Sequence, residues 1–148
     1  MKRISTLVLT LFALATPALS AQYFGQNKVH YQSFDFKIIQ TEHFDVYFYP
    51  EEREAALDAA RMAERSYARL TRVLNHQFTE RKPIVLYASH SQFQQTNISD
   101  IPEGVGGQTD FFKQRNILPF TGSYADFDHV LTHEMVHQFQ YDTWSRGV

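Results

Sequence analysis

Two histidines four positions apart, His133 and His137, enclose Glu134 near the C-terminal end of the chain. A helix turns by about 100° per residue, so residues four apart share a face and both imidazoles can reach one metal ion. Glu134 projects about 100° away from His133, where its carboxylate suits a base better than a ligand. The spacing predicts a helix that binds zinc through His133 and His137, with Glu134 beside the metal.

The flanking residues predict where this helix begins and which face it buries. Ser123 and Asp126 have the spacing of a capping box and follow Gly122. The predicted apolar stripe consists of Phe127, Val130, Leu131, Met135, Val136 and Phe139. The alternative to a zinc-binding helix is an amphipathic surface helix whose two histidines bind no metal.

The stretch 130–139 resembles the extended signature of zincin metallopeptidases, in which an HExxH core is flanked by uncharged residues. Gln140 and Thr143 stand where metzincins have Gly and a third His, and the chain has no Cys to serve as the ligand of a peptide deformylase. The gluzincin type remains, whose third ligand is a Glu on a later helix. The resemblance implies Zn²⁺ as cofactor and either endopeptidase or aminopeptidase activity.

The segments 23–28 and 41–47, followed by a predicted long helix, are similar to bacterial exported peptidase MA-like proteins. Several of those carry a TolB-like β-propeller after the peptidase domain. The resemblance therefore implies a C-terminal propeller in the full-length protein. It spans most of residues 22–148, and the HExxH segment carries its functional content.

Residues 1–21 predict a secretory signal peptide. Lys2 and Arg3 form a positive start, residues 4–15 form an apolar core too short to span a bilayer, and small residues follow. Cleavage after Ser20 and cleavage after Ala21 both fit, and an uncleaved anchor is the alternative to cleavage. We expect an exported protein, periplasmic or secreted, without a stable membrane span.

Composition limits what residues 22–148 can be. The absence of Cys excludes a lipoprotein anchor and disulfides. Without Lys2 and Arg3 the 14 basic residues become 12 against 16 acidic ones, a formal net charge of −4. No basic stripe is present, so we expect no nucleic-acid partner. The length suits one domain with a sizeable core.

Apolar residues at every second position predict a β-hairpin, with Phe34, Phe36 and Ile38 in one strand. A helix is expected from Pro50, with acidic residues in its first turn. The second strand of the hairpin has Phe44, Val46 and Phe48. The core face predicted for the helix consists of Ala56, Ala60, Ala63, Tyr67, Leu70 and Leu74. A row of arginines is expected on its solvent-exposed face: Arg61, Arg65, Arg69 and Arg72.

The remaining segments predict a buried strand at 84–87, a short helix over 92–96 capped by Ser89 or Ser91, and a mobile loop at 98–107. Two strands are expected at 108–112 and 117–120. The predicted fold class is α+β: a mixed sheet with a long helix and the HExxH helix packed against it, as in the upper lobe of a gluzincin.

The strand 107–112 has a second interpretation. In zincins an edge strand beside the metal helix holds peptide substrate by backbone pairing, and the Gly106-Gly107 pair would permit a close approach. An ordinary sheet strand is the alternative.

The other histidines are not expected to bind the metal. His129 shares a helix face with His133 but would lie more than about 10 Å from His137 along the axis, so we expect a supporting or surface position. The histidines remote from the motif are expected at the surface or in hydrogen bonds; they are His30, His43, His76 and His90.

These residues predict zinc-dependent peptide hydrolysis through a metal-activated water, with Glu134 as general base. The rivals are a non-catalytic exported zincin-like binding module attached to a propeller, and a metal-binding protein without peptidase activity. A catalytic zinc needs three protein ligands, and residues 1–148 supply two at helical spacing. We therefore expect this stretch alone to bind zinc weakly, to expose an apolar face along the metal helix and to show no proteolysis.

Overall fold

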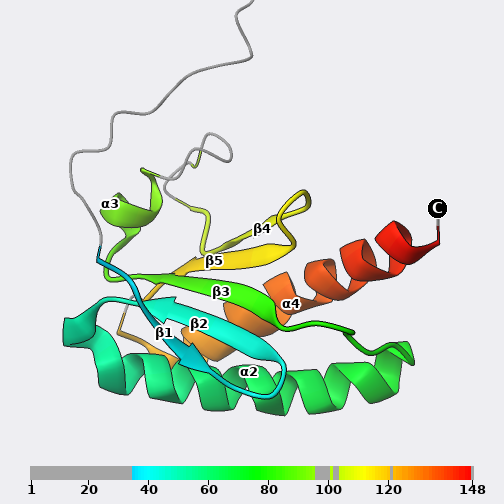
Figure 1. Ribbon diagram of the computed structural model, residues 1–148. Coiled ribbons are helices and arrows are strands. Elements are labelled where there is room, and N and C mark those ends of the chain that lie inside the picture. The colour runs from blue at the N-terminus through cyan, green and yellow to red at the C-terminus, as the bar shows by residue number, and fades with distance from the viewer. Residues whose placement is uncertain (1–34, 96–100, 102–103, 121, 148) are drawn as a thin grey trace, which may run out of the picture.

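The computed structural model describes residues 35–95, 101, 104–120 and 122–147. The predicted signal peptide and the segment 23–28 lie outside the described residues. The described residues form an α+β fold in which one five-stranded mixed sheet carries helices on both faces (Figure 1). The predicted fold class is confirmed at this level.

The expected hairpin is present. Strands β1 (Lys37–Gln40) and β2 (Phe44–Phe48) pair antiparallel, with Ile39 opposite Val46. Ile38 lies in β1 as predicted, and this register turns its neighbour Ile39 toward the main core while Ile38 is 50% exposed. The expected start at 34 lies outside the described residues.

The sheet order is β1-β2-β3-β5-β4, with β3 (Lys82–Tyr87) at its centre. β2, β3 and β5 (Arg115–Pro119) run parallel, whereas β4 (Gln108–Asp110) pairs antiparallel with β5 at one edge. Ile84 and Leu86 enter the main core, while Val85 and Tyr87 pack on the opposite face. Both faces of β3 are covered, which explains its continuous apolar sequence.

The long helix begins with a 3-10 turn, Pro50–Glu52, and continues as α2 (Arg53–Leu74). Its buried face is rich in alanine, which brings the helix axis close to the sheet. Leu74 is 41% exposed because the helix ends there, at the left-handed Asn75; its predicted core position is wrong. The row of four arginines is exposed, as predicted.

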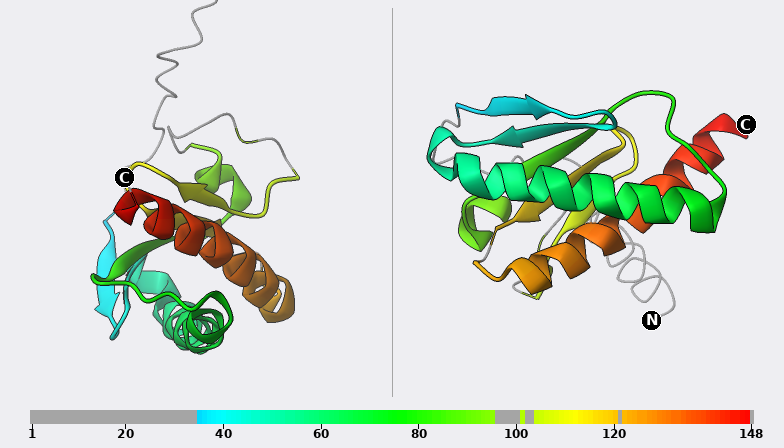
Figure 2. Two further views of the ribbon diagram at one scale, coloured as in Figure 1. Left: turned by 90° about the vertical axis from the view of Figure 1, so that its right-hand side faces the viewer. Right: turned by 90° about the horizontal axis from the view of Figure 1, so that it is seen from below.

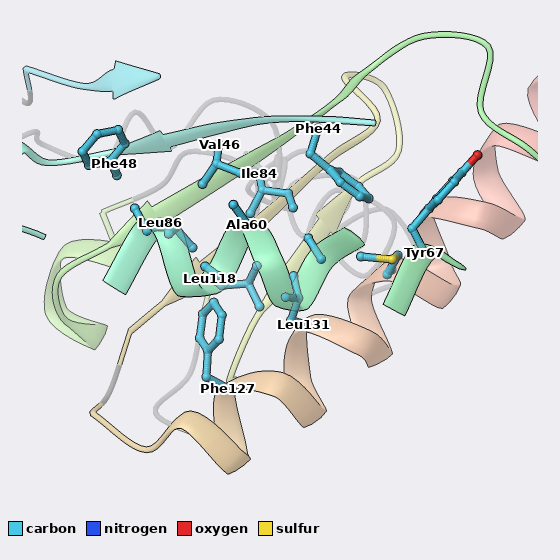
Figure 3. Packing of buried hydrophobic residues seen from close by; sticks show 14 of the residues in the cluster. Phe44, Val46, Phe48, Ala60, Tyr67, Ile84, Leu86, Leu118, Phe127 and Leu131 are labelled. Atoms are coloured by element: carbon cyan, nitrogen blue, oxygen red, sulfur yellow. The ribbon is translucent and has the colours of Figure 1, made fainter. Parts of the chain in front are cut away.

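Helix α4 (Tyr124–Arg146) carries the HExxH residues. The Ser123 hydroxyl accepts a hydrogen bond from the Asp126 backbone N at 3.3 Å, which confirms the predicted cap. Its apolar stripe enters the main core together with α2 (Figure 3). The two helices lie side by side on one sheet face (Figure 2), joined by a 2.8 Å hydrogen bond between Ser66 Oγ and Thr132 Oγ1.

The short elements differ from prediction by a few residues. Helix α3 (His90–Phe93) starts earlier than expected, and Ser89 caps it. β4 ends at Asp110 because Asp110 Oδ1 accepts hydrogen bonds from the backbone N of Phe112 and Lys113, which turns the chain. Of the predicted loop 98–107, positions 98–100, 102 and 103 lie outside the described residues. Within the described ranges, no helix has the length and apolar character that crossing a bilayer requires.

Candidate metal site on helix α4

The two ring nitrogens of the HExxH pair converge. His133 Nε2 and His137 Nε2 are 3.2 Å apart, with the rings edge to face at a centroid distance of 4.8 Å. Tetrahedral zinc, with Zn–N bonds of about 2.0–2.1 Å, places two ligand nitrogens about 3.3 Å apart. The pair therefore fits two positions of such an ion, although the same separation also permits a hydrogen bond between the rings.

The neighbouring side chains favour the tautomer that a metal ligand needs. His137 Nδ1 lies 3.2 Å from Gln140 Oε1, an acceptor, so Nδ1 carries the proton in this contact and Nε2 keeps its lone pair. Tyr141 stacks on the same ring at a centroid distance of 6.3 Å. His133 is exposed and His137 half-buried, so an ion can reach the pair from solvent.

Glu134 follows His133 directly and contacts the edge strand β4. It is 8% exposed, and its Oε2 accepts a 2.6 Å hydrogen bond from the hydroxyl of Thr109 on β4. A Cβ on Gly107 would lie 3.0 Å from Glu134 Cγ and 2.9 Å from Val130 Cγ1. Gly107 thus lets β4 approach α4, whereas the sequence suggested that the glycines make room for substrate.

Two ligand candidates are brought together, and a third is not found among the described residues. No group of three or more His, Cys, Asp or Glu side chains in the described ranges could hold a metal ion. Asp142, two turns beyond Glu134, is 2% exposed and bound elsewhere. Its partners are Lys82 Nζ at 2.6 Å, His76 Nε2 at 2.7 Å and Arg146 Nη2 at 2.6 Å.

The Asp142 cluster fixes the second half of α4. Burial is the largest single effect and raises the pKa of the Asp142 carboxyl, whereas hydrogen bonds from Lys82 and His76 lower it. With the charges of Lys82 and Arg146 added, the pKa lies below its ordinary value, so the carboxylate is ionised at neutral pH. Lys82 is 1% exposed and lies on the central strand, so this ion pair ties α4 to the sheet.

The other described histidines lie at the surface, in hydrogen bonds or against an aromatic ring. His129 is exposed on α4, in agreement with a surface position. His76 and His43 are hydrogen-bonded as predicted, the latter through Nδ1 to Glu64 Oε2 at 2.7 Å. His90 packs against Phe93 at a centroid distance of 5.8 Å. His30 lies outside the described residues.

Exposed aromatic side chains lie beside the histidine pair. Phe111 is 45%, Phe112 92% and Trp144 60% exposed. Tyr141 contacts Phe111 edge to face at 5.0 Å and Trp144 at 5.9 Å, and it also stacks on His137. Part of the apolar exposure expected along the metal helix is therefore present.

A hollow of about 490 Å³ lies elsewhere, between the β1–β2 turn and residues 78–81, and no HExxH residue lines it.

The sequence did not indicate Thr109, Asn116 or Gln138. The last two are fully buried, and Asn116 Nδ2 donates to Gln138 Oε1 at 3.1 Å. The available signal was spacing: Gly107 and Thr109 are two residues apart in the strand predicted at 107–112, and Gln138 is one turn beyond Glu134. Comparison with protein-family models, curated proteins and solved structures found no match to this chain.

Proposed function

We propose that this protein is a zinc-dependent peptidase of the gluzincin type, in which His133 and His137 bind the ion. The observation that carries the proposal is the convergence of their Nε2 atoms to 3.2 Å on one face of α4. The third ligand would come from outside the described residues. The mixed sheet with its antiparallel edge strand over α4 suits the zincin-like upper lobe expected from the sequence.

Bound zinc would supply a Lewis acid and lower the pKa of a coordinated water to about 7. Glu134 follows His133 directly and holds its carboxylate in a largely water-excluded position. It takes a proton from the attacking water and returns it to the leaving amine. His137, with its proton on Nδ1, presents a neutral nitrogen to the ion.

The proposed substrate is a peptide or protein chain in extended conformation. β4 lies at a sheet edge and contacts α4 at Glu134, so a strand added to that edge would pass near the histidine pair. The setting that we propose is the periplasm or the exterior, from the signal peptide predicted at residues 1–21. A β-propeller in the full-length protein remains part of the proposal.

A second candidate is a non-catalytic exported zincin-like module that binds a protein partner. The cluster of exposed aromatics around Phe112 and Trp144 favours it, since aromatic side chains are enriched at protein interfaces. The two functions differ in whether peptide bonds are cleaved.

The test uses the mature exported protein with bound zinc and a mixture of unstructured peptides. We expect hydrolysis that 1,10-phenanthroline stops and that added Zn²⁺ restores. His133→Ala and His137→Ala should each lose zinc and activity, because a two-ligand site retains the ion poorly. His129→Ala, on the same helix face, is the matched control and should keep both. Retention of wild-type zinc by both site variants would overturn the ligand assignment.

A further inference from the structure

Thr109 lies at the middle of β4 and places its hydroxyl among three oxygens. Oγ1 is 2.6 Å from Glu134 Oε2, 2.9 Å from the Glu134 backbone O and 3.1 Å from Asn116 Oδ1. A hydroxyl has one proton to donate. The shortest contact is to the carboxylate, and hydrogen bonds to charged acceptors are about twice as strong as neutral ones. The Thr109 hydroxyl therefore donates its hydrogen bond to the Glu134 carboxylate.

The structure holds Thr109 firmly in this place. Thr109 pairs with Asn116 across the β4–β5 ladder. The fully buried Asn116 donates to Gln138 Oε1, and Gln138 Nε2 donates to the Gln114 backbone O at 2.7 Å. This chain of amides joins β4, β5 and α4 and fixes the distance between Thr109 and the helix turn that carries Glu134.

Glu134 needs such a partner. Its side chain has three rotatable bonds, and a general base acts only from a narrow range of positions. Within the described part of the chain, Thr109 is the hydrogen-bonding partner that the structure gives to its carboxylate. Gly107, directly before β4, leaves room for this contact, because a Cβ there would lie 3.0 Å from Glu134 Cγ.

We propose that Thr109 is a positioning residue that holds the Glu134 carboxylate in the orientation from which it acts as the base. The inference rests on the proposed peptidase function. It assigns to the edge strand a role in the chemistry, separate from pairing with substrate.

The test compares Thr109→Val, which keeps the shape and removes the hydroxyl, with Thr109→Ser, which keeps the hydroxyl. In the zinc-loaded protein we expect Thr109→Val to lower kcat about 10- to 100-fold, since a small misplacement of a reacting group costs about that much. KM and zinc content should remain within about twofold of wild type. Thr109→Ser should keep most of the activity, and a merely structural loss would not show this split.

Crystal structures of the three proteins provide a readout independent of activity. The Glu134 carboxylate should leave its position in Thr109→Val and keep it in Thr109→Ser. An active wild type with an unchanged kcat or an unmoved carboxylate in Thr109→Val overturns the role of Thr109 alone. A wild type that binds zinc without hydrolysing peptides overturns the proposed function, and the crystal structures still decide whether Thr109 orients Glu134.

Discussion

Replacement of Glu134 by Gln should abolish most peptide hydrolysis while leaving zinc and fold in place. The amide has the shape of the carboxylate but cannot accept a proton, so the loss should equal the contribution of general-base catalysis, about 100- to 10,000-fold in kcat. The 2.6 Å hydrogen bond from Thr109 Oγ1 can still be made to the amide oxygen, which keeps β4 against α4. Steady-state kinetics and elemental analysis of the same preparation measure both quantities.

Glu54→Gln is the control, because the Glu54 side chain on α2 is 88% exposed. It should match wild type in rate and zinc content. Near-normal hydrolysis by Glu134→Gln would remove Glu134 from the role of base.

Asp142→Asn should have the largest effect on stability. The change leaves the buried Lys82 ammonium without the carboxylate that lies 2.6 Å away. Breaking a buried pair by removing one partner costs about 3–5 kcal/mol, a large part of a typical stability of about 5–15 kcal/mol. Urea unfolding at pH 7 measures this free energy.

Two comparisons make this prediction specific. Asp128→Asn breaks the exposed pair with Arg65 and should cost less than about 1 kcal/mol. The double variant Lys82→Met with Asp142→Asn should be more stable than Asp142→Asn alone, because no buried ammonium is then left without its closest carboxylate. Equal losses for Asp142→Asn and Asp128→Asn would show that the cluster does not anchor α4.

The Asp142 cluster also predicts a pH dependence. The pKa of Asp142 is lowered in the folded protein, so its contribution is fully present above the ordinary Asp pKa of about 3.9. That contribution is lost as the pH falls through the lower, folded-state pKa. The stability difference between wild type and Asp142→Asn should therefore shrink in the acid range below about pH 4.

The sequence predicted the parts of this fold that depend on local periodicity. The hairpin, the long helix and the Ser123 cap of α4 each have a pattern within a few neighbouring residues. Strand limits were less accurate because hydrogen bonds made by single side chains decide them. Asp110 ends β4 before Phe111, which no alternation of apolar residues indicates.

The candidate site, too, could be predicted from the sequence only where it depends on local spacing. Helical spacing was enough to bring His133 and His137 together, and their 3.2 Å separation agrees with that reasoning. The surroundings of Glu134 could not be predicted, since Thr109 reaches it from a strand 25 residues away. The pairing of Lys82 with Asp142 likewise depends on tertiary packing between β3 and α4.

The most direct test of a zinc site formed by His133 and His137 is an NMR experiment. The protein is labelled with ¹⁵N in its histidine rings and titrated with Zn²⁺. We expect the Nε2 resonances of His133 and His137 to shift together and to saturate at one ion per chain, while His129 is unchanged. The shift should be absent in His137→Ala. Unchanged resonances for the pair, or zinc-dependent shifts confined to other histidines, would contradict a zinc site on α4.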